Sequence, residues 1–117
     1  MESFYLKVEE ILKKDARYKP DSYEFVMQAL YYTQNKLERK GHLSGRDLLD
    51  GIKEFALEQF GTMAKPVLEH WGLHATDDFG NIVFNMVDNG LLSKTENDSA
   101  ADFHDVYKFS DVFKEEL

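Results

Sequence analysis

The stretch at the centre of the predicted fold is Thr76-Asp77-Asp78-Phe79-Gly80-Asn81-Ile82-Val83-Phe84-Asn85-Met86-Val87-Asp88-Asn89-Gly90. Its apolar residues recur at intervals of three and four, which is the spacing of an amphipathic helix with one buried face. Thr76 is predicted as the N-cap, because its hydroxyl can accept from the first free amides. Gly90 is predicted as the residue just past the end.

The segments on either side of this helix predict a winged-helix-like module over residues 43–110. Upstream, we expect a helix from the N-cap Ser44 to Phe60, a short helix over 63–71 and a turn at 72–75. Gly51 inside the first of these helices indicates close packing, because glycine costs about 1 kcal/mol there. A helix, a short turn and a helix are typical of helix-turn-helix proteins. Downstream, 91–95 and 104–109 read as two strands, joined by a wing loop over 96–103.

The amino-terminal third predicts a pair of helices over 1–42. One spans residues 3–15, and the other runs from the N-cap Asp21, with Glu24 at the capping-box position, to about Arg39 and Gly41. Ser110 is predicted to cap a last short helix. The expected fold is therefore mainly α with a small β-hairpin, in a single domain over 1–117. In it, the helical pair packs on the winged-helix-like module, and 111–117 form a tail or short helix.

Charge and composition narrow the function classes. The 117 residues carry a formal charge of −8 and contain no cysteine. Residues 1–42 hold eight basic and seven acidic residues, so the negative charge is concentrated in 43–117. An acidic surface repels phosphates and anionic lipids. The absence of cysteine excludes disulfides and a cysteine-based zinc site. We expect a cytoplasmic protein that does not associate with a membrane.

Several short runs resemble a small family of uncharacterised conserved bacterial proteins. These runs are Tyr23-Glu24-Phe25-Val26, Leu43-Ser44-Gly45, Leu48-Leu49-Asp50-Gly51-Ile52, Ala56-Leu57-Glu58-Gln59-Phe60-Gly61, Trp71-Gly72, Asp78-Phe79-Gly80, Ile82-Val83-Phe84-Asn85 and Gly90-Leu91-Leu92-Ser93-Lys94-Thr95. The resemblance covers about residues 15–113. It implies a bacterial cytoplasmic protein and brings no activity, ligand or catalytic residue with it.

The polar arc of the helix over 76–90 is the first candidate site. Base readout and phosphate anchoring rely on cations and amides, yet this arc combines carboxylates with amides and has no cation. DNA binding through it is therefore not expected. A protein partner or a second copy of the chain is the expected ligand, with Phe84 at the margin of the apolar stripe as an anchor. The predicted partner-binding residues are Asp77, Asp78, Asn81, Phe84, Asn85 and Asp88.

A basic patch near the first two helices supports an alternative function. Its predicted members are Lys13, Lys14, Arg17, Lys36, Arg39 and Lys40. Such a patch would suit a nucleic-acid-binding regulator, because cations that neutralise phosphates supply most non-specific affinity. The competing interpretation is ordinary charge at helix ends.

A third function class is a metal-dependent enzyme using the acidic stripe Asp47, Asp50, Glu54 and Glu58. Carboxylates on one helix face can share a divalent cation, but a solvated face is the favoured interpretation.

His70 and His74 have metal-like spacing, although Gly72 is expected to separate them, and Trp71 between them is expected in the core. His104-Asp105 has the chemistry of an acid–base pair without a nucleophile motif. We assign no catalytic, cofactor or metal residue, and the leading prediction is a non-enzymatic protein-interaction or adaptor domain.

Overall fold

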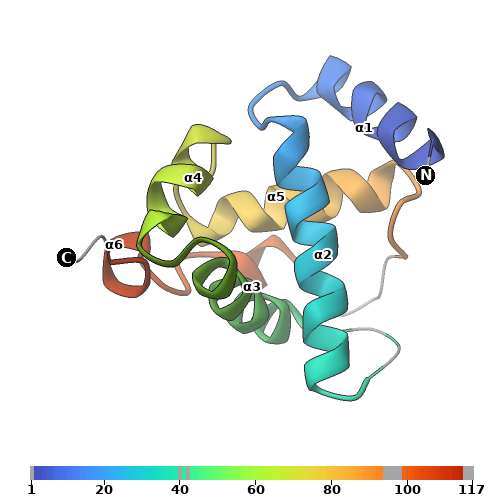
Figure 1. The fold of residues 1–117 in the computed structure, drawn as a ribbon. Coiled ribbons are helices and arrows are strands. Elements are labelled where there is room, and N and C mark those ends of the chain that lie inside the picture. The colour runs from blue at the N-terminus through green and yellow to red at the C-terminus, as the bar shows by residue number, and fades with distance from the viewer. Residues whose placement is uncertain (1, 40, 42, 94–98, 115–117) are drawn as a thin grey trace.

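The computed structural model describes residues 2–39, 41, 43–93 and 99–114. Within these residues the chain is an all-α globule (Figure 1). Its five longer helices are α1 (Glu2–Lys14), α2 (Pro20–Lys36), α3 (Gly45–Phe60), α4 (Ala64–His70) and α5 (Thr76–Asp88). Three one-turn helices are η1 (Gly61–Met63), η2 (Ala100–Phe103) and α6 (Phe109–Val112). The helical part of the predicted fold is confirmed.

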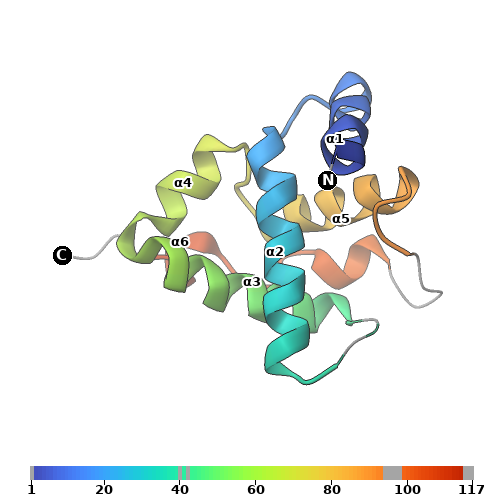
Figure 2. The ribbon, with the colours of Figure 1, turned by 45° about the vertical axis from the view of Figure 1, so that its right-hand side comes forward.

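The α2 helix lies against α5, α3 and α1 and crosses in front of α5 in both views (Figures 1 and 2). Side chains from all of these helices meet in one core, whose largest fully buried members include Tyr23, Phe79, Phe113, Ile11, Leu49 and Ile52. Among the described residues, no helix is both long enough and apolar enough to cross a membrane.

Both predicted ends of α2 are corrected by the structure. The helix begins at Pro20 with Lys19 as N-cap, so Asp21 lies in the first turn rather than at the N-cap. Proline favours the first helical position because its fixed φ is already helical and its missing amide needs no partner there. At the other end Glu38 adopts φ 55°, and the helix stops before the predicted Gly41.

The α3 helix confirms two sequence predictions. Ser44 is its N-cap, and the Ser44 hydroxyl accepts from the Asp47 amide at 3.0 Å. Gly51 is a point of close approach, because a Cβ there would lie 1.7 Å from Oγ1 of Thr33 on α2. That hydroxyl is itself held in place, since it donates to the Ala29 carbonyl at 2.7 Å. The close crossing of α2 and α3 therefore requires a residue without a side chain at position 51.

The α4–turn–α5 order is as predicted, but the cap of α5 is different. The N-cap is Ala75, not Thr76. Asp78 caps the helix instead: its Oδ2 accepts from the amides of His74 at 2.8 Å and Ala75 at 3.1 Å. Gly90, with φ 77°, ends the helix as predicted.

The predicted hairpin is wrong for the described residues. Neither 91–93 nor 104–109 forms a strand, while Lys94, Thr95 and the loop residues 96–98 lie outside the described residues. The Thr76 hydroxyl donates to the Phe103 carbonyl at 2.7 Å and accepts from the Val106 amide at 3.0 Å. The Thr76 side chain at the start of α5 thus bonds a backbone carbonyl and a backbone amide that pairing between two strands would require. Ser110 lies inside α6, whose N-cap is Lys108.

We expect Gly51→Ala to lower the free energy of unfolding by about 1–3 kcal/mol, the usual cost of overpacking a core. The new methyl group would collide with Thr33, and this cost outweighs the gain of about 1 kcal/mol in helix propensity. Urea unfolding followed by circular dichroism measures the difference.

Gly41→Ala is the matched control, because a Cβ at Gly41 has no neighbour within 4 Å. Equal stability of the two variants would show that α2 and α3 do not approach as closely as described.

Candidate interaction surface

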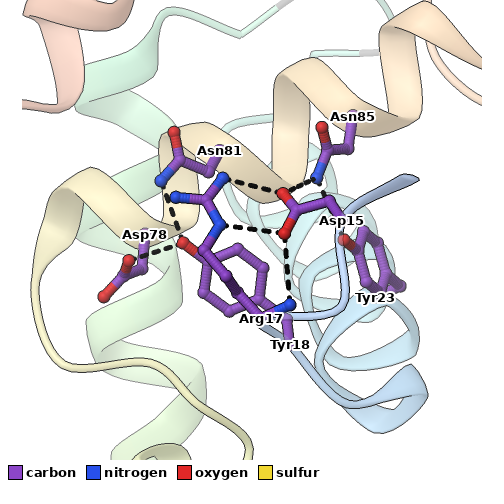
Figure 3. Close-up of polar contacts among 7 residues, drawn as sticks. All are labelled: Asp15, Arg17, Tyr18, Tyr23, Asp78, Asn81 and Asn85. Atoms are coloured by element: carbon purple, nitrogen blue, oxygen red, sulfur yellow. Dashed lines mark hydrogen bonds and ion pairs between the residues drawn. The ribbon is translucent and has the colours of Figure 1, made fainter. Parts of the chain in front are cut away.

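The short connector between α1 and α2 carries a tightly bound carboxylate (Figure 3). Asp15 Oδ1 accepts from the Arg17 amide at 3.1 Å and from Arg17 Nε at 2.8 Å, while Asp15 Oδ2 accepts from a terminal guanidinium nitrogen at 2.7 Å. This two-pronged contact suits the planar guanidinium. Hydrogen bonding to Arg17 holds the pKa of Asp15 well below its usual range. The carboxylate therefore stays charged at any physiological pH.

Tyr18 joins the same connector to the first turns of α5. Tyr18 is only 2% exposed. Its hydroxyl donates to Asp78 Oδ1 at 2.6 Å and accepts from Asn81 Nδ2 at 2.9 Å. Burial, with the hydrogen bond to Asp78, raises the pKa of Tyr18 well above its ordinary value. The phenol is therefore neutral and able to donate.

Asn85, one turn further along α5, extends this set of contacts. Its Nδ2 donates to Asp15 Oδ2 at 2.9 Å and to the hydroxyl of Tyr23 at 3.1 Å. Tyr23 is completely buried, and burial raises its pKa. Figure 3 shows Asp78, Asn81 and Asn85 facing the connector and Tyr23. We call these seven residues (Asp15, Arg17, Tyr18, Tyr23, Asp78, Asn81 and Asn85) the connector network.

The polar arc of α5, predicted to bind a partner, is largely covered by the chain itself. Three of its five members belong to the connector network, and a fourth, Asp77, binds His104 and the Asp105 amide. Asp88 is exposed, and the side chain of Asp77 remains 45% accessible. The predicted role of these residues in partner binding stays a prediction, but most of their polar atoms are already engaged within the chain.

Phe84 is half-buried rather than free. Its ring packs edge-to-face on Phe103, with 5.9 Å between centroids and 82° between planes. Gly80, one turn earlier, is covered by the same ring, because a Cβ there would lie 2.8 Å from Phe103 side-chain atoms. The margin of the apolar stripe is therefore closed by η2, a contact that helical periodicity cannot reveal.

The predicted basic patch falls into two separate groups. Lys13, Lys14 and Arg17 lie before α2, and Lys36 and Arg39 lie at its far end. The 17 residues of α2 separate them by about 25 Å at 1.5 Å per residue. Lys40 lies outside the described residues. Four of the cations are paired: Lys13 with Glu10, Arg17 with Asp15, Lys36 with Glu54 and Arg39 with Asp47.

Two members of the acidic stripe form ion pairs with the cations at the far end of α2. Asp47 and Glu54 pair with Arg39 and Lys36 across the α2–α3 contact, and Asp50 and Glu58 are exposed. Among the described residues, no group of three His, Asp or Glu side chains is arranged to hold a metal ion. His70 and His74 are exposed at the end of α4 and in the turn. Between them Trp71 packs on the rings of Phe25 and Phe60.

An ion pair joins the carboxy-terminal segment to α5. His104 Nδ1 lies 2.8 Å from Asp77 Oδ2, and the Asp105 amide donates to Asp77 Oδ1 at 3.1 Å. Hydrogen bonding to Asp77 raises the pKa of His104, and the same contact lowers the pKa of Asp77. The sequence pairing His104-Asp105 did not identify this partner, which lies 27 residues earlier.

Sequence reasoning also missed three exposed large side chains on the first two helices, two of them aromatic and one aliphatic. Tyr5 and Leu6 on α1 and Tyr31 on α2 are 52%, 59% and 60% exposed. The sequence could have indicated their exposure, because all three lie outside the apolar arcs of their helices. We call Tyr5, Leu6 and Tyr31 the tyrosine patch.

Comparison with known proteins finds no matching family model, no matching curated protein and no matching solved structure. The resemblance to uncharacterised bacterial proteins stays a prediction.

We expect Asn85→Ala to lower the free energy of unfolding by about 1–3 kcal/mol, because it leaves the Tyr23 hydroxyl and Asp15 short of a donor. Chemical unfolding measures the change. Asn35→Ala on the exposed end of α2 is the control and should stay within about 0.5 kcal/mol of wild type. If Asn85→Ala matched this control, the α5 arc would be solvated.

His104 should titrate above the ordinary histidine value of about 6.5. Because its pKa is raised in the folded protein, the pair stabilises the fold fully below the unfolded pKa, and this contribution is lost as pH rises through the folded pKa. The pKa of Asp77 is lowered in the folded protein. The stability that Asp77 contributes is therefore lost at acidic pH, as the pH falls through the pKa of the folded carboxyl group. NMR titration of the His104 ring measures the midpoint.

Asp77→Asn is the control for this titration. It should return the His104 midpoint towards the ordinary value. An identical midpoint in wild type and variant would contradict the pairing.

Proposed function

We propose that this chain is a non-enzymatic protein-interaction domain whose contact surface is the tyrosine patch. The supporting observation is the exposure of Tyr5, Leu6 and Tyr31, each more than half accessible on an otherwise well-packed globule. Tyrosine is enriched at the energetic centre of protein interfaces, because it supplies a large rigid apolar surface with a polar end.

The patch spans two helices that are joined by a polar contact. The Tyr5 hydroxyl donates to Glu24 Oε2 at 2.7 Å, which places the α1 side of the patch beside α2. Tyr31 follows Glu24 by seven residues, so it lies on the same face of α2, about 10 Å along the axis. Tyr31 therefore shares a face of α2 with Glu24, the residue that Tyr5 of α1 contacts.

Charge favours a protein over a nucleic acid as the partner. The formal charge of −8 opposes encounter with phosphates. A nucleic-acid-binding regulator would need its cations in one place, whereas they lie at the two ends of α2 and four of them are paired within the chain. The order of α4 and α5 is compatible with a helix-turn-helix, and we infer a scaffold role for it.

Site-specific photo-crosslinking in cells tests this proposal. A photoreactive phenylalanine at position 31 should crosslink to a protein, whereas the same group at Met63 should not. Met63 is the control because it is 57% exposed yet belongs to η1, which links α3 to α4 away from α1 (Figures 1 and 2).

A Tyr5→Ala/Tyr31→Ala variant should weaken binding of the captured partner by about tenfold or more, as expected for interface anchors. Its circular dichroism spectrum should match that of wild type, because both side chains are exposed. Equal crosslinking at 31 and 63, or unchanged partner affinity in the double variant, would refute the proposal.

A further inference from the structure

A pocket of about 230 Å³ lies where α4, the turn before α5 and the segment 105–110 meet. Its apolar walls include Ala75, Tyr107 and Phe109. The Tyr107 hydroxyl is committed to the Leu49 carbonyl at 2.8 Å, and Phe109 is 4% exposed. These contacts make the walls rigid. The volume is below the range of about 300–1,000 Å³ for pockets that bind drug-sized ligands, so a smaller molecule is the appropriate size.

Polar groups of both charges line this pocket. Lys65 and Glu69 on α4 form an ion pair at 3.1 Å and line one side. Lys108, Ser110 and Asp105 line the side formed by the carboxy-terminal segment, and His74 lies in the turn before α5. Within the described part of the chain, the Lys108 ammonium and the Ser110 hydroxyl have no hydrogen-bond or ion-pair partner. The Asp105 carboxylate likewise accepts no hydrogen bond there. Two opposite charges and a hydroxyl are thus available beside an apolar wall.

Asp105 is held in this position by its own backbone. It adopts φ 47°, a left-handed conformation that aspartate tolerates better than most residues. Its amide donates to Asp77 Oδ1 at 3.1 Å, which ties the turn to α5. The negative charge at the pocket is therefore presented by a braced turn rather than a free loop.

We propose that this pocket binds a small zwitterion of the amino-acid class. Its carboxylate would meet Lys108 and Ser110, its ammonium would meet Asp105, and an apolar side chain would lie on Tyr107 and Phe109. An anion alone would face the charges of Asp105 and Glu69, and a cation alone would face those of Lys65 and Lys108. A zwitterion places each of its two charges beside a pocket residue of the opposite charge.

This site is independent of the proposed protein-interaction function. The pocket involves α4 and the segment next to α6, at the side of the molecule away from α1 (Figures 1 and 2). Loss of one activity need not affect the other.

The test is an amide-resolved NMR titration of the full chain with L-leucine, L-phenylalanine, L-glutamate and L-lysine. At least one should give saturable shifts at Ala75, Asp105 and Ser110, with a dissociation constant of about 1 mM or tighter. Two half-ligands provide the sharpest comparison with leucine. These are 4-methylpentanoate, which lacks the ammonium, and 3-methylbutylamine, which lacks the carboxylate. Each should bind at least about tenfold more weakly than leucine if leucine binds.

Two variants locate the charges. Lys108→Gln and Asp105→Asn should each weaken the binding about tenfold, and asparagine keeps the left-handed backbone that position 105 requires. Lys14→Gln, an exposed cation on α1, should bind like wild type. Absence of saturable pocket shifts with all four amino acids, equal affinity for a half-ligand, or wild-type binding by both pocket variants would overturn the proposal.

Discussion

Asp15 and Tyr18 fasten the connector between α1 and α2 to the polar face of α5, and the placement of α1 follows from this contact. Both side chains bring polar atoms into a largely buried position, which is costly unless every atom finds a partner. Arg17 and Asn85 satisfy the Asp15 carboxylate, while Asp78 and Asn81 satisfy the Tyr18 hydroxyl. Because such a network is stabilising only when complete, the amides on α5 are read most simply as internal structural groups. The face that resembles a recognition surface in sequence is occupied by the chain itself.

The opposite edge of α5 is occupied in the same way. Thr76 and Asp77 bind the backbone and side chains of the segment around Phe103, which covers Gly80 and Phe84. Much of the charge elsewhere is also neutralised, since the cations at the end of α2 pair with carboxylates of α3. Among the described residues, we propose the tyrosine patch and the pocket beside α4 as the places where other molecules bind. Both are features of the accessible surface that the charge pattern did not identify.

The sequence predicted the helices well because their apolar residues obey the helical period and some of their ends carry recognisable residues, such as Ser44 and Gly90. It failed where partners lie far along the chain. The period shows which arc of α5 is not apolar, but not what covers it, and Asn81 and Asn85 bind residues 63 and 70 positions away. The prediction of a hairpin was wrong for a related reason, because it too depends on a partner far along the chain. The β-branched and aromatic residues Val106, Tyr107 and Phe109 were interpreted as a strand, whereas the Val106 amide donates to the hydroxyl of Thr76, 30 residues earlier. The sequence therefore identified the polar arc of α5 but not the groups of the chain that cover it, and the predicted role of the arc in partner binding stays a prediction.

The central claim is that the polar face of α5 is packed against the connector and Tyr23. It is tested most directly by nuclear Overhauser contacts from the side-chain amide protons of Asn81 and Asn85. The structure predicts contacts from Asn81 to the ring of Tyr18 and from Asn85 to the ring of Tyr23, with amide exchange slower than that of the exposed Asn35. If these contacts were missing, and both amides exchanged as fast as Asn35, the face would be open to solvent and the account would be contradicted.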